Sequence, residues 1–180
     1  MRPLLLVIFL LPLFIKAQTV TNVLPLDSAT QKYMYTEVVK VDSASADALY
    51  SRAKVALAKL FVSGKDVSQV SDDNAKQVVG KGFTECITSD GMMKRDFGKI
   101  WFVLTIQCKD GRYKYTISDF EQESTAWPYT LGALEQEKVK LITKNTWSRI
   151  RSYTAEQMTA LIADLKKIMS NAANSNSNNW

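Results

Sequence analysis

The sequence predicts an α+β fold in which one antiparallel sheet carries two helices on one face. Two stretches, residues 46–61 and 158–169, repeat apolar residues every three or four positions, as amphipathic helices do. Between them, strand-like segments follow one another from residue 67 to residue 121 instead of alternating with helices. Strands that follow one another directly pair as antiparallel neighbours, so we expect the second face of the sheet to be partly open.

The first 17 residues resemble a secretory signal peptide. Arg2 precedes an apolar run from Pro3 to Ile15, which is shorter than the about 20 residues of a membrane-spanning helix. We expect cleavage after Ala17 and an exported protein, periplasmic or secreted, without a transmembrane anchor; a retained anchor is the alternative. Residues 18–32 are polar and contain proline, so we expect a linker before a domain spanning residues 33–170.

A strand and a helix open this domain. Residues 33–41 are rich in tyrosine, threonine and valine, which favour strands. Ser43 or Ser45 is the expected helix cap, and Asp47 lies in the first turn, where the helix dipole favours an anion. The apolar stripe of this helix comprises Leu49, Ala53, Ala56, Leu57, Leu60 and Phe61.

Four further strands are expected between this helix and the second one. The pair Asp110-Gly111 predicts a tight hairpin between the last two strands, and residues 89–98 read as a loop. Gly80 and Gly82 fall inside a strand, where glycine often marks a bulge or a close backbone approach. The expected strands are residues 67–70, 76–88, 99–108 and 112–121.

The C-terminal part is less regular. Residues 124–130 read as an aromatic loop, and residues 131–153 have a weak helical pattern. Thr154 and Gln157 form a capping box, so we expect the second helix to begin there. Residues 171–180 are polar and of low complexity, which predicts a disordered tail.

The succession "YTEVVKVDSASADALYSRAKVALAKLF", "QVVGKG" and "KIWFVLTIQCKDGRYKYTISDF" resembles an exported family of unknown function with a TATA-binding-protein-like (TBP-like) fold, common in Bacteroidota. The resemblance covers about residues 33–122. It implies a curved sheet in the order strand, helix, four strands, helix, with the first strand beside the fifth and the helices on the convex side. It implies no catalytic residues. Because fold does not imply function, and an exported protein meets little genomic DNA, we expect no nucleic-acid partner.

Aromatic residues on the strands are the candidate ligand-binding residues. Side chains alternate along a strand, so Tyr33 and Tyr35 share one face, as do Tyr113 and Tyr115. If the first and fifth strands are neighbours, these tyrosines either form a stacking platform for a ligand or pair across the sheet as support. Which face they occupy is left open. Trp101 lies opposite the apolar alternation of its own strand and is the fifth candidate.

The two cysteines are expected to be buried free thiols. A hairpin around residues 89–98 places Cys86 opposite Trp101 and Cys108 opposite Val79. That register separates the thiols by about 20 Å, whereas a disulfide needs α-carbons within about 7 Å. A disulfide between Cys86 and Cys108 would require a bulge or a change of register.

Metal and cofactor chemistry is not expected. The chain has no histidine, no close cysteine pair and no complete calcium-loop spacing around "SDDNAK". Six basic residues near loops and strand ends suggest either a polyanion or phospholipid head-group site or a solvated rim: Lys94, Arg95, Lys99, Lys109, Arg112 and Lys114.

The function predicted from these observations is binding without catalysis. We expect an exported domain that binds a small ligand or an envelope protein through its open sheet face. The alternatives are a structural accessory of an envelope complex and a small histidine-free hydrolase. The hydrolase would rely on a serine–lysine pair or on the carboxylates of Asp119, Glu121 and Glu123.

Overall fold

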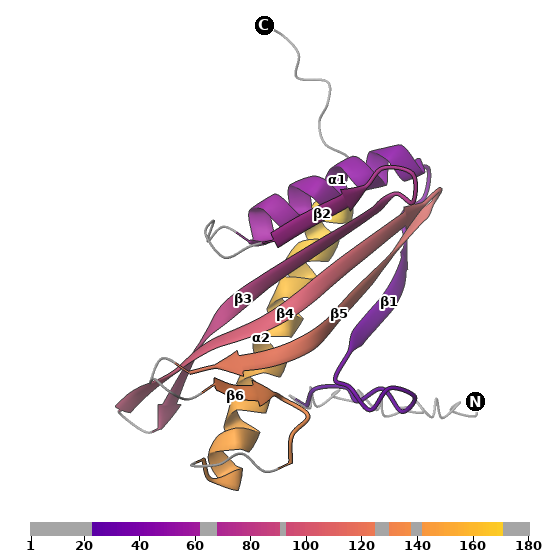
Figure 1. Cartoon of the computed structure of the whole chain (residues 1–180). Coiled ribbons are helices and arrows are strands. Elements are labelled where there is room, and N and C mark those ends of the chain that lie inside the picture. The colour runs from indigo at the N-terminus through magenta and orange to yellow at the C-terminus, as the bar shows by residue number, and fades with distance from the viewer. Residues whose placement is uncertain (1–22, 62–67, 91–92, 125–129, 138–141, 171–180) are drawn as a thin grey trace, which may run out of the picture.

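The structure is a computed structural model that describes residues 23–61, 68–90, 93–124, 130–137 and 142–170 (Figure 1). The expected signal peptide and C-terminal tail lie outside these ranges. The elements are β1 (Tyr35–Lys40), α1 (Ala46–Leu60), β2 (Ser68–Asp72), β3 (Gln77–Asp90), β4 (Met93–Lys109), β5 (Arg112–Glu123), β6 (Thr130–Ala133) and α2 (Lys144–Ser170).

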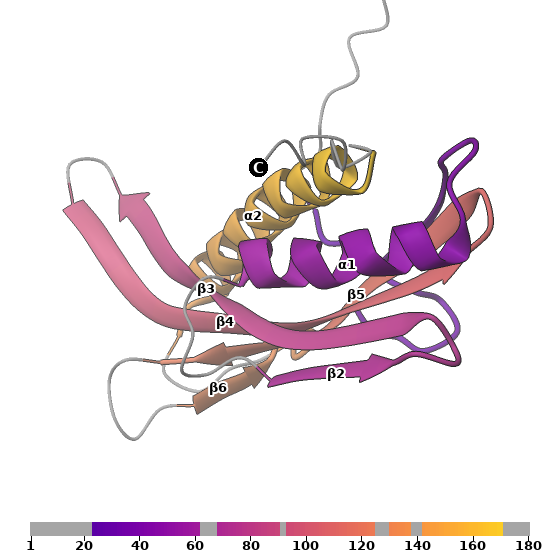
Figure 2. The ribbon, with the colours of Figure 1, turned by 90° about the horizontal axis from the view of Figure 1, so that it is seen from above.

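The strands form one antiparallel six-stranded sheet in the order β1-β5-β4-β3-β2, with β6 also paired to β5. The predicted α+β class and the placement of β1 beside β5 are confirmed. Both helices lie on one side of the sheet, as expected (Figure 2). However, the ends of β3 and β4 bend toward the helices in this view, so the helices occupy the concave side and not the convex one.

The core lies between the helices and the even-numbered residues of β4. Ile100, Phe102, Leu104 and Ile106 are at most 1 % exposed, which confirms the predicted apolar face. A β-carbon on Gly82 would come within 2.3 Å of the Phe61 ring, so this glycine allows the end of α1 to approach β3. The Asp110-Gly111 turn is confirmed, and Gly111 adopts a positive φ of 70°.

The β3–β4 hairpin is longer than predicted. Residues 93–98, expected in a loop, belong to β4, and the ladder reaches the pair Asp90 and Met93. A bulge interrupts the ladder between Glu85 and Ile87, opposite Gly98, whose φ is 86°. The polar and charged side chains here resemble a loop in sequence, but they occur on a strand.

The second helix begins at Lys144 and not at Thr154, so the predicted capping box is wrong. Thr154 is fully buried in mid-helix, and its hydroxyl donates to the carbonyl of Ile150 at 2.8 Å. Trp147 and Ile150 are buried and extend the apolar stripe toward the N-terminus of α2. In the first helix, by contrast, Ser45 is the cap as expected, since its side chain accepts from the Ala48 amide.

Two further segments differ from the sequence-based expectation. The strand β6 forms where the aromatic loop and the weak helix were expected. Residues 23–32, within the expected linker, pack against the domain, because Leu24 is 2 % exposed and Leu26 forms a bridge with Tyr33.

Candidate functional site

Tyr113 and Tyr115 belong to the core and not to the open face. They are 1 % and 3 % exposed and share the helix-facing side of β5 with Ile117. The Tyr115 hydroxyl donates to Glu37 of β1 at 2.7 Å, and Glu37 in turn pairs with Lys166 of α2. Burial raises the pKa of Tyr113 to about 12 and also raises that of Tyr115. These two tyrosines therefore support the sheet instead of forming an exposed platform.

Tyr33 and Tyr35 also pack against the core, although both are only half-buried. The Tyr35 ring meets Phe120 edge to face with centroids 6.4 Å apart, and burial raises the Tyr35 pKa to about 12. The Arg151 guanidinium of α2 lies 5.6 Å from the Tyr33 ring. The five candidate residues thus do not gather on one surface, because Trp101 alone lies on the open face.

The aromatic pair Phe83–Trp101 is the main feature of the open face. These residues are direct partners across β3 and β4, with ring centroids 5.0 Å apart and planes tilted by 59°. Both are partly exposed. The Trp101 indole N–H donates to the Glu123 carboxylate, which fixes the ring from the neighbouring strand β5. We call Phe83 and Trp101 the aromatic platform.

Two lysines flank the aromatic platform. The Lys99 ammonium lies 4.2 Å from the Phe83 ring centroid and 5.5 Å from that of Trp101. Lys81 contributes a second ammonium 5.6 Å from the Trp101 ring. Cations over ring faces are attracted by the ring quadrupole, so the platform is held in place and is also surrounded by hydrogen-bond donors.

Sequence reasoning missed Phe83 because it assumed the wrong register. The expected hairpin placed Cys86 opposite Trp101, whereas the ladder places Phe83 there. The hairpin extends to the pair Asp90 and Met93, which shifts the pairing by four residues from the expected one, and the bulge near Gly98 shifts it back by one. The available signal was the alternation of apolar residues along β4, which correctly assigned Trp101 to the open face.

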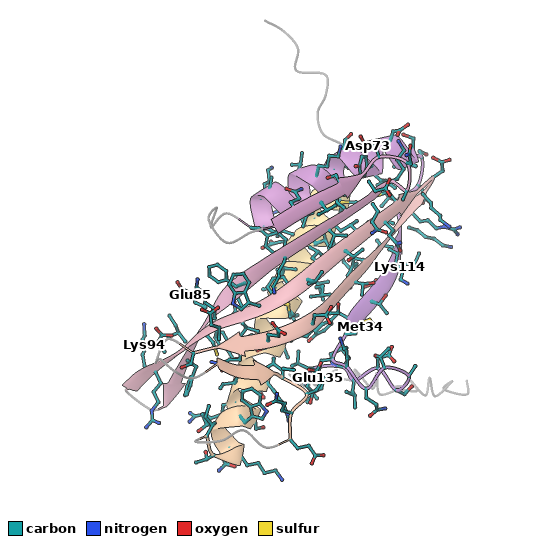
Figure 3. All side chains as sticks on the ribbon, viewed as in Figure 1. Met34, Asp73, Glu85, Lys94, Lys114 and Glu135 are labelled. Atoms are coloured by element: carbon teal, nitrogen blue, oxygen red, sulfur yellow. The ribbon has the colours of Figure 1, made fainter. Side chains whose placement is uncertain are left out.

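The part of the open face away from the aromatic platform is mixed in character. It carries valines, threonines and charged side chains, and Val70 on the edge strand β2 is 63 % exposed. Figure 3 shows Glu85 and Lys114 on the face that is turned away from the helices, far apart along the sheet. Lys94 lies at one tip and Lys114 toward the other end, so the six basic residues singled out in the sequence do not form one cluster.

The cysteines confirm the thiol prediction, although not the register on which it rested. Cys86 and Cys108 are both free and buried. Burial raises the pKa of Cys86 to about 12 and that of Cys108 to about 11. Both side chains are therefore protonated at neutral pH and are weak nucleophiles.

The carboxylates considered for catalysis are separated by a bulge in β5. Asp119 has a positive φ of 56°, and Phe120 takes the next buried position. The Lys32 ammonium lies 2.7 Å from the Asp119 carboxylate and lowers its pKa, which is opposite to the shift that a general acid requires. Glu121 lies opposite Trp101, and Glu123 lies opposite Lys99.

The described part of the chain contains neither a metal-binding cluster nor a membrane-spanning helix. No group of three or more cysteine, aspartate or glutamate side chains there is arranged to hold a metal ion. Neither of its two helices combines the length and the apolar character needed to cross a membrane.

Comparisons with known proteins agree on the fold. Residues 35–123 match the family model described as a domain of unknown function (DUF4468) with a TBP-like fold. The crystal structure of a TBP-like protein from Parabacteroides distasonis superposes with a TM-score of 0.65 at 18% identity, over 83% of this chain and 98% of that one. The crystal structure of a DUF4468 family protein from Bacteroides ovatus gives a TM-score of 0.67 at 14% identity, over 84% and 92% of the two chains. No curated protein matches the chain.

Proposed function

Residues 35–123 form a domain of this TBP-like family of unknown function, and from that premise we propose that the protein is an exported, non-catalytic binding domain. Its open sheet face holds a small ligand or an envelope protein. The observation that supports this proposal is the partly exposed Phe83–Trp101 pair on the face opposite the helices.

The aromatic platform suits binding for a physical reason. Aromatic rings supply a large contact area with few rotatable bonds, so little side-chain entropy is lost when a partner covers them. Trp101 is already oriented by its hydrogen bond to Glu123. Lys81 adds donors at the rim of the platform, which gives a partner a polar contact in addition to stacking.

The proposed site also differs from an enzyme active site. An active site usually contains an acid, base or nucleophile whose pKa is shifted toward neutrality. The two thiols are buried and protonated at neutral pH, and the pKa of Asp119 is lowered and not raised. These features favour binding over a histidine-free hydrolase.

Export is the part of the proposal that rests on the sequence alone. Arg2 and the apolar run to Ile15 are typical of a signal peptide. Mass spectrometry of the protein from its native host tests this point. We expect a mature chain that begins at Gln18 and is recovered outside the cytoplasm, and an intact Met1 in a cytoplasmic fraction would contradict it.

The binding proposal is tested by purifying the wild-type protein and two variants from the native envelope. The molecules that copurify with each of them are then compared. Phe83→Ala/Trp101→Ala removes the platform, and Val103→Arg places a bulky charge beside it without removing the rings. Val55→Ala, at an exposed position of α1 on the other side of the sheet, is the matched control.

We expect both open-face variants to lose the copurifying molecule and the control to retain it. Circular dichroism of each variant checks that the fold is intact. Equal recovery of the same molecule by Val103→Arg and by Val55→Ala would show that the open face is not the binding surface.

A further inference from the structure

A cavity of about 370 Å³ lies at the end of the open face where β4 turns into β5. Its walls include Val38 of β1, Gln107 and Lys109 of β4, and Arg112 and Lys114 of β5. Figure 3 shows Lys114 in this region, well separated from Glu85 beside the aromatic platform. The volume is within the range of pockets that bind small molecules.

Cations are concentrated around this cavity by the register of the sheet. Lys40 of β1 lies opposite Arg112 of β5, and Arg112 lies opposite Lys109 of β4, so three cations form one row across three strands. Lys114 is two residues from Arg112 and therefore on the same face. Directly opposed β-carbons are about 5 Å apart, at which distance like charges repel and destabilise a sheet.

No carboxylate of the described residues pairs with the cations of this row. Lys40, Lys109, Arg112 and Lys114 form no ion pair or side-chain hydrogen bond with the residues described there. The nearby Asp110 carboxylate instead accepts from the Ala46 amide at 2.7 Å, at the start of α1.

Four lysines elsewhere in the domain have carboxylate partners. Each of the four lies within 3.1 Å of a carboxylate oxygen, in the pairs Lys32–Asp119, Lys54–Asp73, Lys76–Asp47 and Lys166–Glu37. Other exposed lysines, such as Lys59 and Lys167 on the helices, also lack a carboxylate partner among the described residues, but they do not lie directly opposite another cation as Lys40, Lys109 and Arg112 do. An anion in the cavity would relieve the repulsion within the row.

We propose that this cavity binds a phosphate monoester group. Such a group carries nearly two negative charges at neutral pH and three acceptor oxygens, which suits several cations better than a single carboxylate does. The Arg112 guanidinium can donate two parallel hydrogen bonds to one phosphate, while the lysines act as point charges around it. Val38, which is 57 % exposed, forms an apolar wall for the carbon part of the ester.

This site is independent of the aromatic platform and does not rest on the proposed function. It lies at the other end of the open face and shares no residue with the platform. Phe83→Ala/Trp101→Ala is therefore expected to bind the phosphate monoester as the wild type does. The failure of one proposal leaves the other standing.

The test measures binding to two sources of the same chemical group. Isothermal titration of the purified protein with glycerol 3-phosphate at low salt reports a soluble ester, with glycerol as the phosphate-free control. Cosedimentation with phosphatidylcholine vesicles that contain phosphatidic acid reports a lipid headgroup, with phosphatidylcholine alone as the control. Arg112→Gln/Lys114→Gln removes two of the cations, and Lys40→Gln/Lys109→Gln is a second variant in case the first does not fold.

The matched control for charge is Lys59→Gln/Lys167→Gln, which removes two exposed lysines from the helices. We expect saturable binding of one of the two sources, weakened at least tenfold by either cavity variant because charge-assisted hydrogen bonds are lost. The control is expected to bind as the wild type does. Absence of saturable binding to both sources, or equal affinity in the cavity variants, would overturn the proposal.

Discussion

The two faces of the sheet use aromatic residues in opposite ways. On the helix side, Tyr113 and Tyr115 are buried and brace β5 against β1 and α2. On the open side, Phe83 and Trp101 contact each other and remain partly exposed. The comparison shows that the role of an aromatic residue in a strand depends on the face of the sheet to which its side chain points. Alternate residues of a strand point to opposite faces.

The largest expected difference in the free energy of unfolding is between variants of two neighbouring residues of β4. Phe102 is 1 % exposed and contacts Phe61 and Phe120, whereas Trp101 lies on the open face. We expect Phe102→Ala to lower the free energy of unfolding by about 4 kcal/mol, since it leaves a cavity in the core. Trp101→Ala is expected to cost about 1 kcal/mol, because its ring is partly solvated.

Urea denaturation followed by far-ultraviolet circular dichroism measures both free energies. Thr105→Ala, on the open face of the same strand, is a control expected to change stability little. Equal losses for Phe102→Ala and Trp101→Ala would remove the distinction between the two faces.

A smaller difference in stability is expected between variants of the two buried tyrosines. The Tyr115 hydroxyl has a partner in Glu37, whereas the buried Tyr113 hydroxyl has none among the described residues. We expect Tyr115→Phe to destabilise the protein by about 1 kcal/mol, because a hydrogen bond to a charged group is lost. Tyr113→Phe is expected to be neutral or stabilising, because it removes an unpaired polar atom from the core.

Thermal melts of the two phenylalanine variants provide the measurement, and each serves as the control for the other. A larger loss for Tyr113→Phe than for Tyr115→Phe would mean that the Tyr113 hydroxyl has a partner in solution.

The smallest expected change in stability concerns the ion pair between Glu37 of the sheet and Lys166 of α2. Hydrogen bonds from Lys166 and then from Tyr115 lower the pKa of Glu37 below its ordinary value. A carboxyl whose pKa is lower in the folded state stabilises the fold above its unfolded pKa, and it loses that contribution as the pH falls through its folded pKa. Because the Glu37 side chain is 44 % exposed, solvent screening keeps the contribution small.

Denaturation of wild type and Glu37→Gln at a series of pH values checks this linkage. We expect the wild type to be the more stable at pH 7 and the difference to shrink below about pH 4.5, as Glu37 becomes protonated. Lys59→Gln, at an exposed lysine on α1, is the control without such a dependence. A difference that stays constant down to pH 2 would contradict the assigned role of the Glu37 carboxylate.

Several elements could be predicted because their signals are local. The Ser45 cap, the apolar stripe of α1 and the Asp110-Gly111 turn each depend on residues a few positions apart. The start of α2 could not be predicted in this way. Its first turn contains Asn145 and Thr146, which have low helix propensity, but packing of Trp147 and Ile150 in the core compensates for the weak local preference.

The candidate site shows the same division. Trp101 was assigned to the open face by the alternation of its own strand, whereas its partner Phe83 depends on how β3 and β4 are aligned. The length of the hairpin, which extends to Asp90 and Met93, sets most of that alignment, and the bulge opposite Cys86 adds a shift of one residue along the rest of the ladder. The row of cations likewise requires three strands in register, which no single segment specifies.

The sequence by itself determined the class of fold, the approximate positions of five of the six strands and the two sets of side chains on the central strand β4. It could do so because propensity and alternation act between residues close in the chain. Only the tertiary structure decided which residues of different strands meet, and that all four candidate tyrosines pack against the core while Trp101 and Phe83 lie outside. The physical reason is that the length of the hairpin and a bulge together set the pairing between strands, and neither leaves a distinct local pattern, so side-chain partners follow from the assembled sheet.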